Sequence, residues 1–234
     1  MAAAHRRREV SRIEGFSDAV FAFAITLLVV SLEVPKTYDE LIAVLRGFPA
    51  FAVCFALLFQ VWWRHYTFFR SYDLEDGATI ALTGVLLFVV LFYVYPLKFM
   101  WSLSLSQLRV LMPEQVIRTD QVPALFAIYG AGVMATFGLL AALYGHAYRL
   151  RASLGLTPVE VLDARAAVYG NLGIAAVALV SVVLALILGR TAPHLVGLAG
   201  YVYFAIGLVG WRLGKYRGRE RRRLQASTTS TSTA

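Results

Sequence analysis

The sequence has few of the residues with which soluble enzymes hold metals, phosphates or nucleophiles. Its single cysteine, Cys54, excludes an intrachain disulfide and lies in an apolar run, where it is best interpreted as a small packing residue. The histidines are scattered over separate segments, so there is no metal-spaced His/Cys cluster, and neither a P-loop nor a nucleophile elbow occurs. These absences argue against a hydrolase or an ATPase, and we predict no cofactor and no enzymatic activity.

Charge is also scarce. Only 15% of the 234 residues are charged, 59% are hydrophobic, and the mean hydropathy is +0.67. A soluble domain contains about 45–50% apolar residues, so most of this chain must face lipid or other membrane helices. The composition therefore predicts an all-α, multi-pass protein of the cell (inner) membrane, with membrane lipid among its partners.

Six apolar segments are long enough to cross about 30 Å of hydrocarbon at about 1.5 Å per residue. The first runs from about Ile13 to Val34, and the others begin after Pro49, at Ala78, after Pro123, at Ala166 and at Leu195. The first segment follows basic residues, as a signal peptide does, but it is too long and ends in "SLEVPK" rather than in a small-residue cleavage site. We interpret it as a retained helix, so residues 1–213 are predicted to form a six-helix transmembrane domain.

The distribution of Lys and Arg predicts the orientation of these helices. An even number of spans puts both termini on one side, and the segments on that side carry most of the Lys and Arg, which indicates the cytoplasm. The net charge of +8 then reflects topology and contact with anionic headgroups rather than binding of nucleic acid. Residues 214–234 have no apolar periodicity and are predicted to be a basic, disordered cytoplasmic tail.

The first apolar segment contains a carboxylate, Asp18. Insertion scales assign an Asp at a helix centre a cost of about 2.5–3.5 kcal/mol, so it must be paired or protonated. Topology puts it at the depth of residues 61–66, "VWWRHY". The candidate partners are Arg12, Arg64, His65, Trp62 and Trp63. Two roles stay open for Asp18, a structural clamp and a proton relay.

The same segment has an apolar face that points away from Asp18. At about 100° per residue, four side chains fall within about 60° of one another, and Thr26 borders them. These four are Phe16, Phe23, Leu27 and Val30. Asp18 lies about 140° from Phe23 on the helical wheel. If the apolar face lines a pathway, Asp18 faces a neighbouring helix instead.

Three motifs in these segments resemble those of the transmembrane protein 175 family of potassium channels. They are Arg12-x-x-x-Phe16-Ser17-Asp18 followed by "AVFAFAITLLVVSLEVP", Trp62-x-x-His65 in "VWWRHYTFF", and "YPL" at residues 95–97. The resemblance implies a homotetramer with six helices per subunit and a pore lined by the first helix of each subunit. A carbonyl selectivity filter is not implied, and the sequence contains no "TVGYG"-like segment.

The resemblance also implies roles for residues of the first helix. It assigns the narrowest ring to Phe23, further apolar rings to Leu27 and Val30, and a hydroxyl ring to Thr26. We expect a structural network that positions this helix, formed by Arg12, Phe16, Ser17, Asp18, Trp62 and His65. Two departures stand out: relatives usually carry Ile or Leu where this chain has Phe23, and often a second His where it has Tyr66.

The leading hypothesis is a passive, potassium-permeable cation channel with a hydrophobic constriction, in which K⁺ is the permeant ion. The alternative is a proton-coupled secondary transporter in which Asp18 and His65 carry the proton. Transporters often show internal repeats and helices broken at mid-membrane, whereas this sequence shows no convincing repeat and has Pro96 near the outer end of the third helix. A non-transporting scaffold or membrane enzyme is a third class, and the sequence contains no set of residues that would indicate either function.

Overall fold

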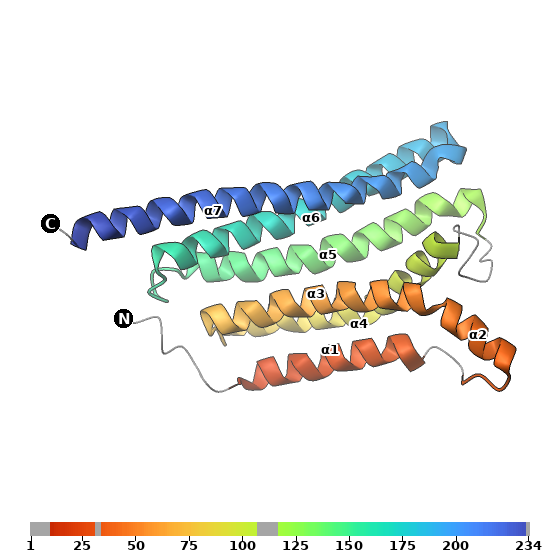
Figure 1. Ribbon diagram of the computed structural model, residues 1–234, viewed down its shortest axis with the longest axis horizontal. Helices are drawn as coiled ribbons and strands as arrows, with labels where there is room; N and C mark the ends of the chain where they lie inside the picture. The colour runs from red at the N-terminus through yellow and green to blue at the C-terminus, as the bar shows by residue number, and fades with distance from the viewer. Residues whose placement is uncertain (1–9, 31–33, 107–116, 233–234) are drawn as a thin grey trace.

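The computed structural model describes residues 10–30, 34–106 and 117–232, and their side chains as far as Arg223 except that of Val30. Every regular element in these ranges is helical. The elements are α1 (Arg12–Val30), α2 (Tyr38–Arg46), α3 (Phe48–Tyr72), α4 (Gly77–Ser106), η2 (Thr119–Gln121), α5 (Val122–Arg149), α6 (Pro158–Thr191), η3 (Pro193–Phe204) and α7 (Ala205–Ser232). Figure 1 shows the long helices lying side by side, with the start of α1 and the end of α7 at the same end of the bundle. The predicted all-α class is confirmed.

Four segments are long and apolar enough to cross a membrane: Gly77–Ser106, Thr119–Arg149, Pro158–Thr191 and Pro193–Arg223. A fifth candidate is the pair of α2 and α3, which are bent by 42° relative to each other. In its described part, α1 carries Arg12, Glu14 and Asp18 and does not join this set. These spans support a multi-pass membrane protein, while the count of six stays a prediction.

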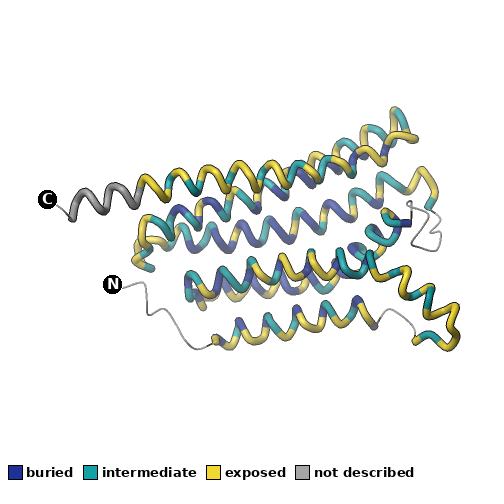
Figure 2. Tube along the Cα trace, viewed as in Figure 1, coloured by how far each residue is buried: buried dark blue, intermediate teal, exposed yellow. Residues whose placement is uncertain are grey.

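From α3 onward each long helix packs against the next one along the chain, whereas α1 packs against two later helices. α1 packs against α3 and α4, α5 against α4 and α6, and α7 mainly against α6. Buried positions lie where these helices face one another, and large apolar side chains remain exposed on the outside of the bundle (Figure 2). In a membrane such a surface faces lipid or another subunit rather than water.

One close approach fixes α4 against α5. The Tyr93 hydroxyl on α4 donates a 2.8 Å hydrogen bond to the Tyr129 carbonyl on α5. Gly132 makes room for this ring, because a Cβ at that position would lie 2.0 Å from a Tyr93 ring carbon. The missing side chain therefore lets an aromatic ring bridge two membrane helices.

The structure differs from the sequence-based expectation at two helix ends. α6 begins at Pro158, before the predicted Ala166, because Thr157 and Glu160 form a capping box ahead of the apolar run. α7 continues as a helix through Ser232, although residues 214–234 were predicted to be disordered. Arg and Glu are good helix formers, and Arg217 bonds Asp163 on α6, so charge contacts stabilise a helix that has no apolar periodicity.

Candidate ion pathway on helix α1

The two faces of α1 differ sharply in burial. Its buried positions are Glu14, Ser17, Phe21, Ala24 and Leu28, and its exposed positions up to Val29 are Arg12, Gly15, Phe16, Ala19, Ala22, Phe23, Thr26 and Val29. Spacings of three and four residues place each set on one side of the helix. Phe23 is 57% exposed, whereas Phe21 is 2% exposed. We call the exposed set from Gly15 to Val29 the open face of α1.

The open face is uncharged and carries a single hydroxyl. Thr26 donates that hydroxyl to the Ala22 carbonyl at 2.8 Å, so the oxygen lone pairs remain available on the exposed side. Leu27 is half-buried at the edge of the open face and packs against the core. The side chain of Val30 lies outside the described residues. The open face of one subunit thus carries bulky apolar side chains and a hydroxyl acceptor, about one helical turn apart.

Asp18 turns away from the open face and contacts α3. The Trp62 indole Nε1 donates a 2.7 Å hydrogen bond to Asp18 Oδ1. The Trp62 ring is stacked on Tyr66 with a centroid separation of 5.4 Å, and it also packs against Phe59 at 5.1 Å. This contact ties α1 to α3 through a ring that is itself held by neighbouring aromatic side chains.

The other candidate partners of Asp18 lie elsewhere. Arg64 donates its Nη1 to Asn171 Oδ1 on α6 at 2.9 Å. His65 is 1% exposed and packs between the Phe21 and Phe69 rings, with centroid distances of 5.8 and 4.8 Å. Among the described residues its Nε2 has no hydrogen-bond partner. Of the five candidate partners predicted for Asp18, the structure places Trp62 in hydrogen-bond contact with it.

The remaining residues of the expected network divide between the two faces. The fully buried Ser17 donates its hydroxyl to the Ile13 carbonyl at 2.7 Å, which satisfies it within α1. Phe16 is 60% exposed and lies on the open face with Phe23, and Arg12 is exposed at the start of the helix. Among the described residues no hydrogen bond or ion pair joins either of them to Asp18, so the polar contact of Asp18 involves fewer residues than the six expected.

Both ends of α1 are also held by contacts that the sequence analysis did not identify. At the start, the Glu14 backbone N–H donates to the Ser11 hydroxyl at 3.1 Å, which is an N-cap contact. Near the other end, the Lys98 ammonium of α4 donates to the Leu28 carbonyl at 3.3 Å. A cation at this end also interacts favourably with the helix dipole. The spacing Ser11-x-x-Glu14 and an isolated Lys98 in an apolar run were the available signals.

Known proteins are similar to this chain in sequence, including α1 and α3, and in fold. The family described as "Endosomal/lysosomal potassium channel TMEM175" matches residues 12–93, which include α1 and α3. A protein of Marivirga tractuosa described as a potassium channel is 37% identical over 229 residues, which cover 94% of this chain and 92% of that protein. The chain belongs to the TMEM175 family. The predicted membership is confirmed.

Solved structures extend the similarity from sequence to fold. A crystal structure of a variant of the potassium channel MtTMEM175, in complex with a nanobody fusion protein, matches with a TM-score of 0.81 and 33% identity over 93% of this chain and 97% of that one. A TMEM175 homologue from Chamaesiphon minutus shares the fold, with a TM-score of 0.55 and 23% identity over 88% of this chain and 99% of that one. The TMEM175 relatives are ion channels rather than enzymes, and the chain is a multi-pass membrane protein of the prokaryotic inner membrane.

Proposed function

We propose that this TMEM175 chain forms a passive, potassium-permeable cation channel whose pore is lined by α1 of each subunit. The observation that carries the proposal is the open face of α1, which is exposed and uncharged in one subunit although Asp18 sits on the same helix. The names of the relatives, which are potassium channels, support K⁺ as the permeant ion.

The constriction is assigned to Phe23, the bulkiest side chain at the middle of the open face. Narrow apolar rings expel water and with it any hydrated ion, so the ring itself can close the pathway. Leu27 and Val30 are assigned to further apolar rings, and Thr26 to a ring of hydroxyl acceptors. Without a cage of backbone carbonyls, preference for K⁺ over Na⁺ is expected to be modest.

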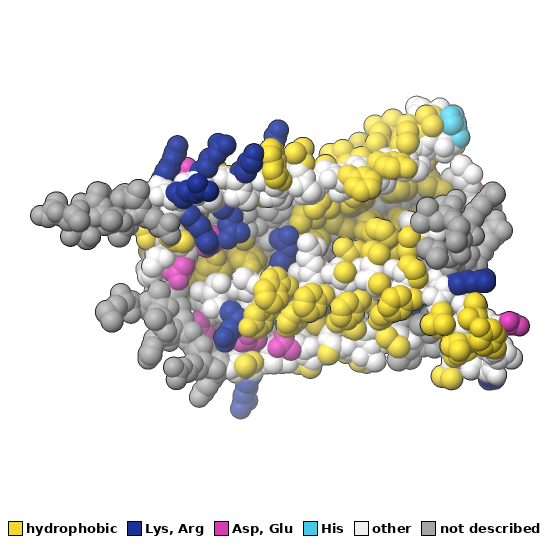
Figure 3. Space-filling model, in the orientation of Figure 1, with side chains coloured by type: hydrophobic (Ala, Val, Ile, Leu, Met, Phe, Trp, Pro, Cys, Tyr) yellow, Lys and Arg dark blue, Asp and Glu magenta, His cyan; other side chains and the backbone are white. Residues whose placement is uncertain are grey.

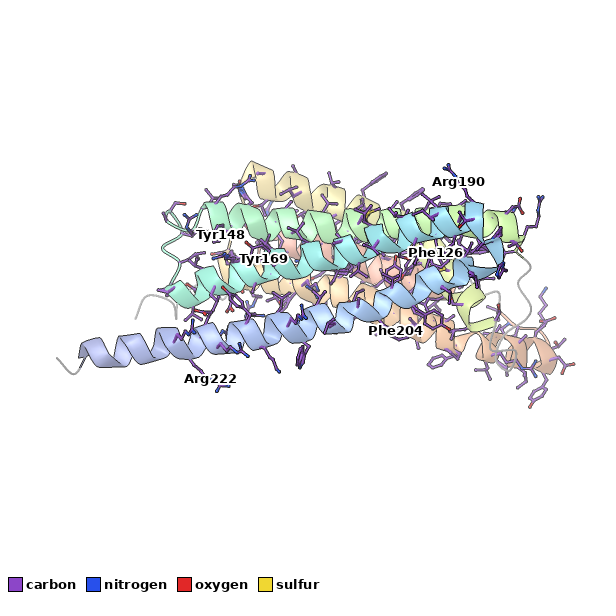
Figure 4. All side chains as sticks on the ribbon, turned by 90° about the horizontal axis from the view of Figure 1, so that it is seen from above. Phe126, Tyr148, Tyr169, Arg190, Phe204 and Arg222 are labelled. Carbon is purple, nitrogen blue, oxygen red and sulfur yellow. The ribbon has the colours of Figure 1, made fainter. Side chains whose placement is uncertain are left out.

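The proposed topology has six spans, in which α1, the α2–α3 pair and the continuous η3–α7 segment each count as one, and both termini are cytoplasmic. Lys and Arg side chains gather at the end of the bundle where the C-terminal half of α7 lies (Figure 3). Figure 4 shows Arg222 at that end and Arg190 at the opposite end. The excess of basic residues at the end shared by the start of α1 and the end of α7 supports a cytoplasmic location. Residues 1–213 would form the channel domain, and residues 214–234 a basic cytoplasmic tail whose part up to Ser232 continues α7.

The Asp18–Trp62 contact is proposed to act as a clamp that holds the pore helix. The geometry favours this role over the proton-coupled transporter, because Asp18 is bonded to an indole and His65 packs between two phenyl rings. Among the described residues, no hydrogen bond joins Asp18 to His65. A proton relay would need such a contact or a water path between them.

The reversal potential of the reconstituted protein tests the proposed function. In a planar bilayer with a K⁺ gradient and equal pH on both sides, we expect a current whose reversal potential shifts toward the K⁺ equilibrium potential. A coupled carrier would instead require a second solute or respond to an imposed pH gradient. A current that reverses with the proton gradient, or one that needs a co-substrate, would refute the channel.

We predict that the protein assembles as a homotetramer, because one copy of α1 cannot enclose a pathway. Native mass spectrometry in mild detergent should give four chains per particle. Closed point-group symmetry with an isologous or ring-forming interface is the rule for such assemblies. Observation of monomers alone, in preparations that still conduct K⁺ after reconstitution, would contradict the prediction.

We predict that Thr26→Val weakens discrimination between K⁺ and Na⁺ and leaves the closed state intact. Valine keeps the shape of threonine and removes the hydroxyl, so a ring of acceptors is lost while the width stays the same. The permeability ratio should fall by about two- to tenfold, which corresponds to about 0.4–1.4 kcal/mol. Bi-ionic reversal potentials provide the measurement, and an unchanged ratio would remove Thr26 from the selectivity mechanism.

A further inference from the structure

A cavity of about 580 Å³ lies between α3 and α7, away from the open face of α1. Its walls come from α3, α5, α6 and α7, and Figure 3 views the face of the molecule on which α3 and α7 flank it. The volume is in the range of small-molecule binding sites, which is about 300–1,000 Å³. The proposed ion pathway makes no use of this cavity, so its occupant is a separate question.

The polar side chains of the cavity carry an excess of positive charge. Its lining contains Arg64 and Arg217 and one acidic residue, Asp163. Asp163 is already neutralised, because Arg217 donates two bonds to its Oδ1, at 3.2 and 2.8 Å, and Arg221 donates to its Oδ2. Arg64 therefore has no carboxylate partner among the described residues.

Arg64 is held in position with donors to spare. One of its five N–H groups bonds Asn171 Oδ1, and its guanidinium lies 5.6 Å from the centroid of the Phe137 ring. Asn171 is fully buried, so its amide fixes the guanidinium rather than competing for an external ligand. An arginine at membrane depth is expected to pair with an anion or to line a polar cavity. Its planar fork suits the oxygens of a phosphate.

The cavity has a polar end and an apolar end in the order that a phospholipid requires. Tyr72 and Arg217 lie toward the cytoplasmic end proposed above, and Arg64 lies about 12 Å below the end of α3 at 1.5 Å per residue. Deeper in the bundle the lining is mostly aliphatic, with Ile206 and Val209 on α7 and Ile174 on α6, and Gln60 of α3 is the polar side chain at that depth. A headgroup phosphate at the arginines would therefore leave acyl chains against the aliphatic wall.

Glycines on α7 leave space for such a chain. Gly210 and Gly214 line the cavity, and a Cβ at either position would meet no atom within 4 Å. Large apolar residues on a lipid-facing helix would otherwise fill this volume. Three observations carry a proposal: Arg64 has no carboxylate partner among the described residues, the deeper walls are mostly aliphatic, and the two glycines leave open space. We propose that this cavity binds one anionic phospholipid of the cytoplasmic leaflet through its phosphodiester.

Native mass spectrometry of the purified full-length assembly tests this inference, with phosphatidylglycerol and phosphatidylcholine titrated separately. Wild type should bind phosphatidylglycerol about tenfold more tightly than phosphatidylcholine. Arg64→Gln should abolish most of this preference for phosphatidylglycerol. The matched control is Arg212→Gln, an exposed arginine of α7 that does not line the cavity, which should leave binding unchanged. If both variants lost the same amount of phosphatidylglycerol binding, the attraction would be non-specific and the proposed site would be refuted.

A second pair of variants changes no charge. Gly210→Leu should fill the cavity and weaken phosphatidylglycerol binding about tenfold, whereas Gly207→Leu, which also meets no atom within 4 Å but does not line the cavity, should not. Leucine is a better helix former than glycine, so neither change should unfold α7. Equal binding by the two variants would overturn the proposal. Displacement of the lipid by millimolar inorganic phosphate would overturn it as well, in favour of a soluble anion.

Discussion

Replacement of Phe23 by alanine should raise basal K⁺ flux through reconstituted protein by about tenfold or more, which corresponds to a barrier lower by about 1.4 kcal/mol. If four Phe23 rings form the narrowest part of the pathway, alanine widens it and weakens the expulsion of water. Phe23→Ser should raise the flux as well, because a hydroxyl favours water in the gap. Release of K⁺ from proteoliposomes, followed at equal protein density, measures the effect.

Phe21→Ala is the matched control, because it removes the same ring from the opposite side of α1. Phe21 is 2% exposed and contacts the His65 ring, so its truncation should leave a cavity in the core. A Phe→Ala change in a core costs about 3–5 kcal/mol, and it should lower thermal stability while leaving flux per folded channel unchanged. Equal increases in flux from the two variants would show that the wrong face of α1 had been assigned to the pore.

Asp18→Ala should lower the yield of folded oligomer and its melting temperature. It removes the acceptor of the Trp62 indole and leaves a donor unpaired at the contact between α1 and α3, at a cost of about 1–3 kcal/mol. Asp18→Asn retains an oxygen acceptor and should be milder. Thermal unfolding followed by size-exclusion chromatography in detergent gives the measurement, with Asp39→Ala on the exposed face of α2 as the control.

A double-mutant cycle separates the clamp from a general effect of charge. Trp62→Phe removes the same hydrogen bond from the other side, so the double variant should be less destabilised than the sum of the two single variants, by about 0.5–3 kcal/mol. Purely additive losses would mean that Asp18 and Trp62 contribute independently. If Asp18→Ala and Asp18→Asn both gave normal oligomer yield and unchanged flux, the clamp would be refuted.

The helical class and the two faces of α1 could be predicted from the sequence because apolar periodicity reports them directly. Phe23 and Phe21 are two residues apart, so the helical wheel puts them on opposite sides, and their burial follows that division. Trp62 was among the predicted partners of Asp18, since the end of one span and the start of another must lie at one depth. Local pattern and topology were sufficient for these features.

The choice among several possible partners could not be predicted. Arg64 and His65 neighbour Trp62 in sequence, but on a helix they project in different directions, and each meets a helix whose rotation the sequence does not reveal. Arg64 bonds Asn171 of α6, more than a hundred positions away along the chain. The helical continuation of α7 was missed for the same reason, because Asp163, which bonds Arg217, lies on another helix. Long-range packing decides such contacts.

Thiol accessibility on α1 tests the central claim most directly. The chain has one cysteine, and Cys54 is fully buried, so wild type should not respond to a membrane-impermeant, positively charged thiol reagent. K⁺ current through Thr26→Cys should be blocked by the reagent, because the thiol would face the pathway, and current through Phe21→Cys should persist. Block of Phe21→Cys together with an unaffected Thr26→Cys current would contradict a pore lined by the open face of α1.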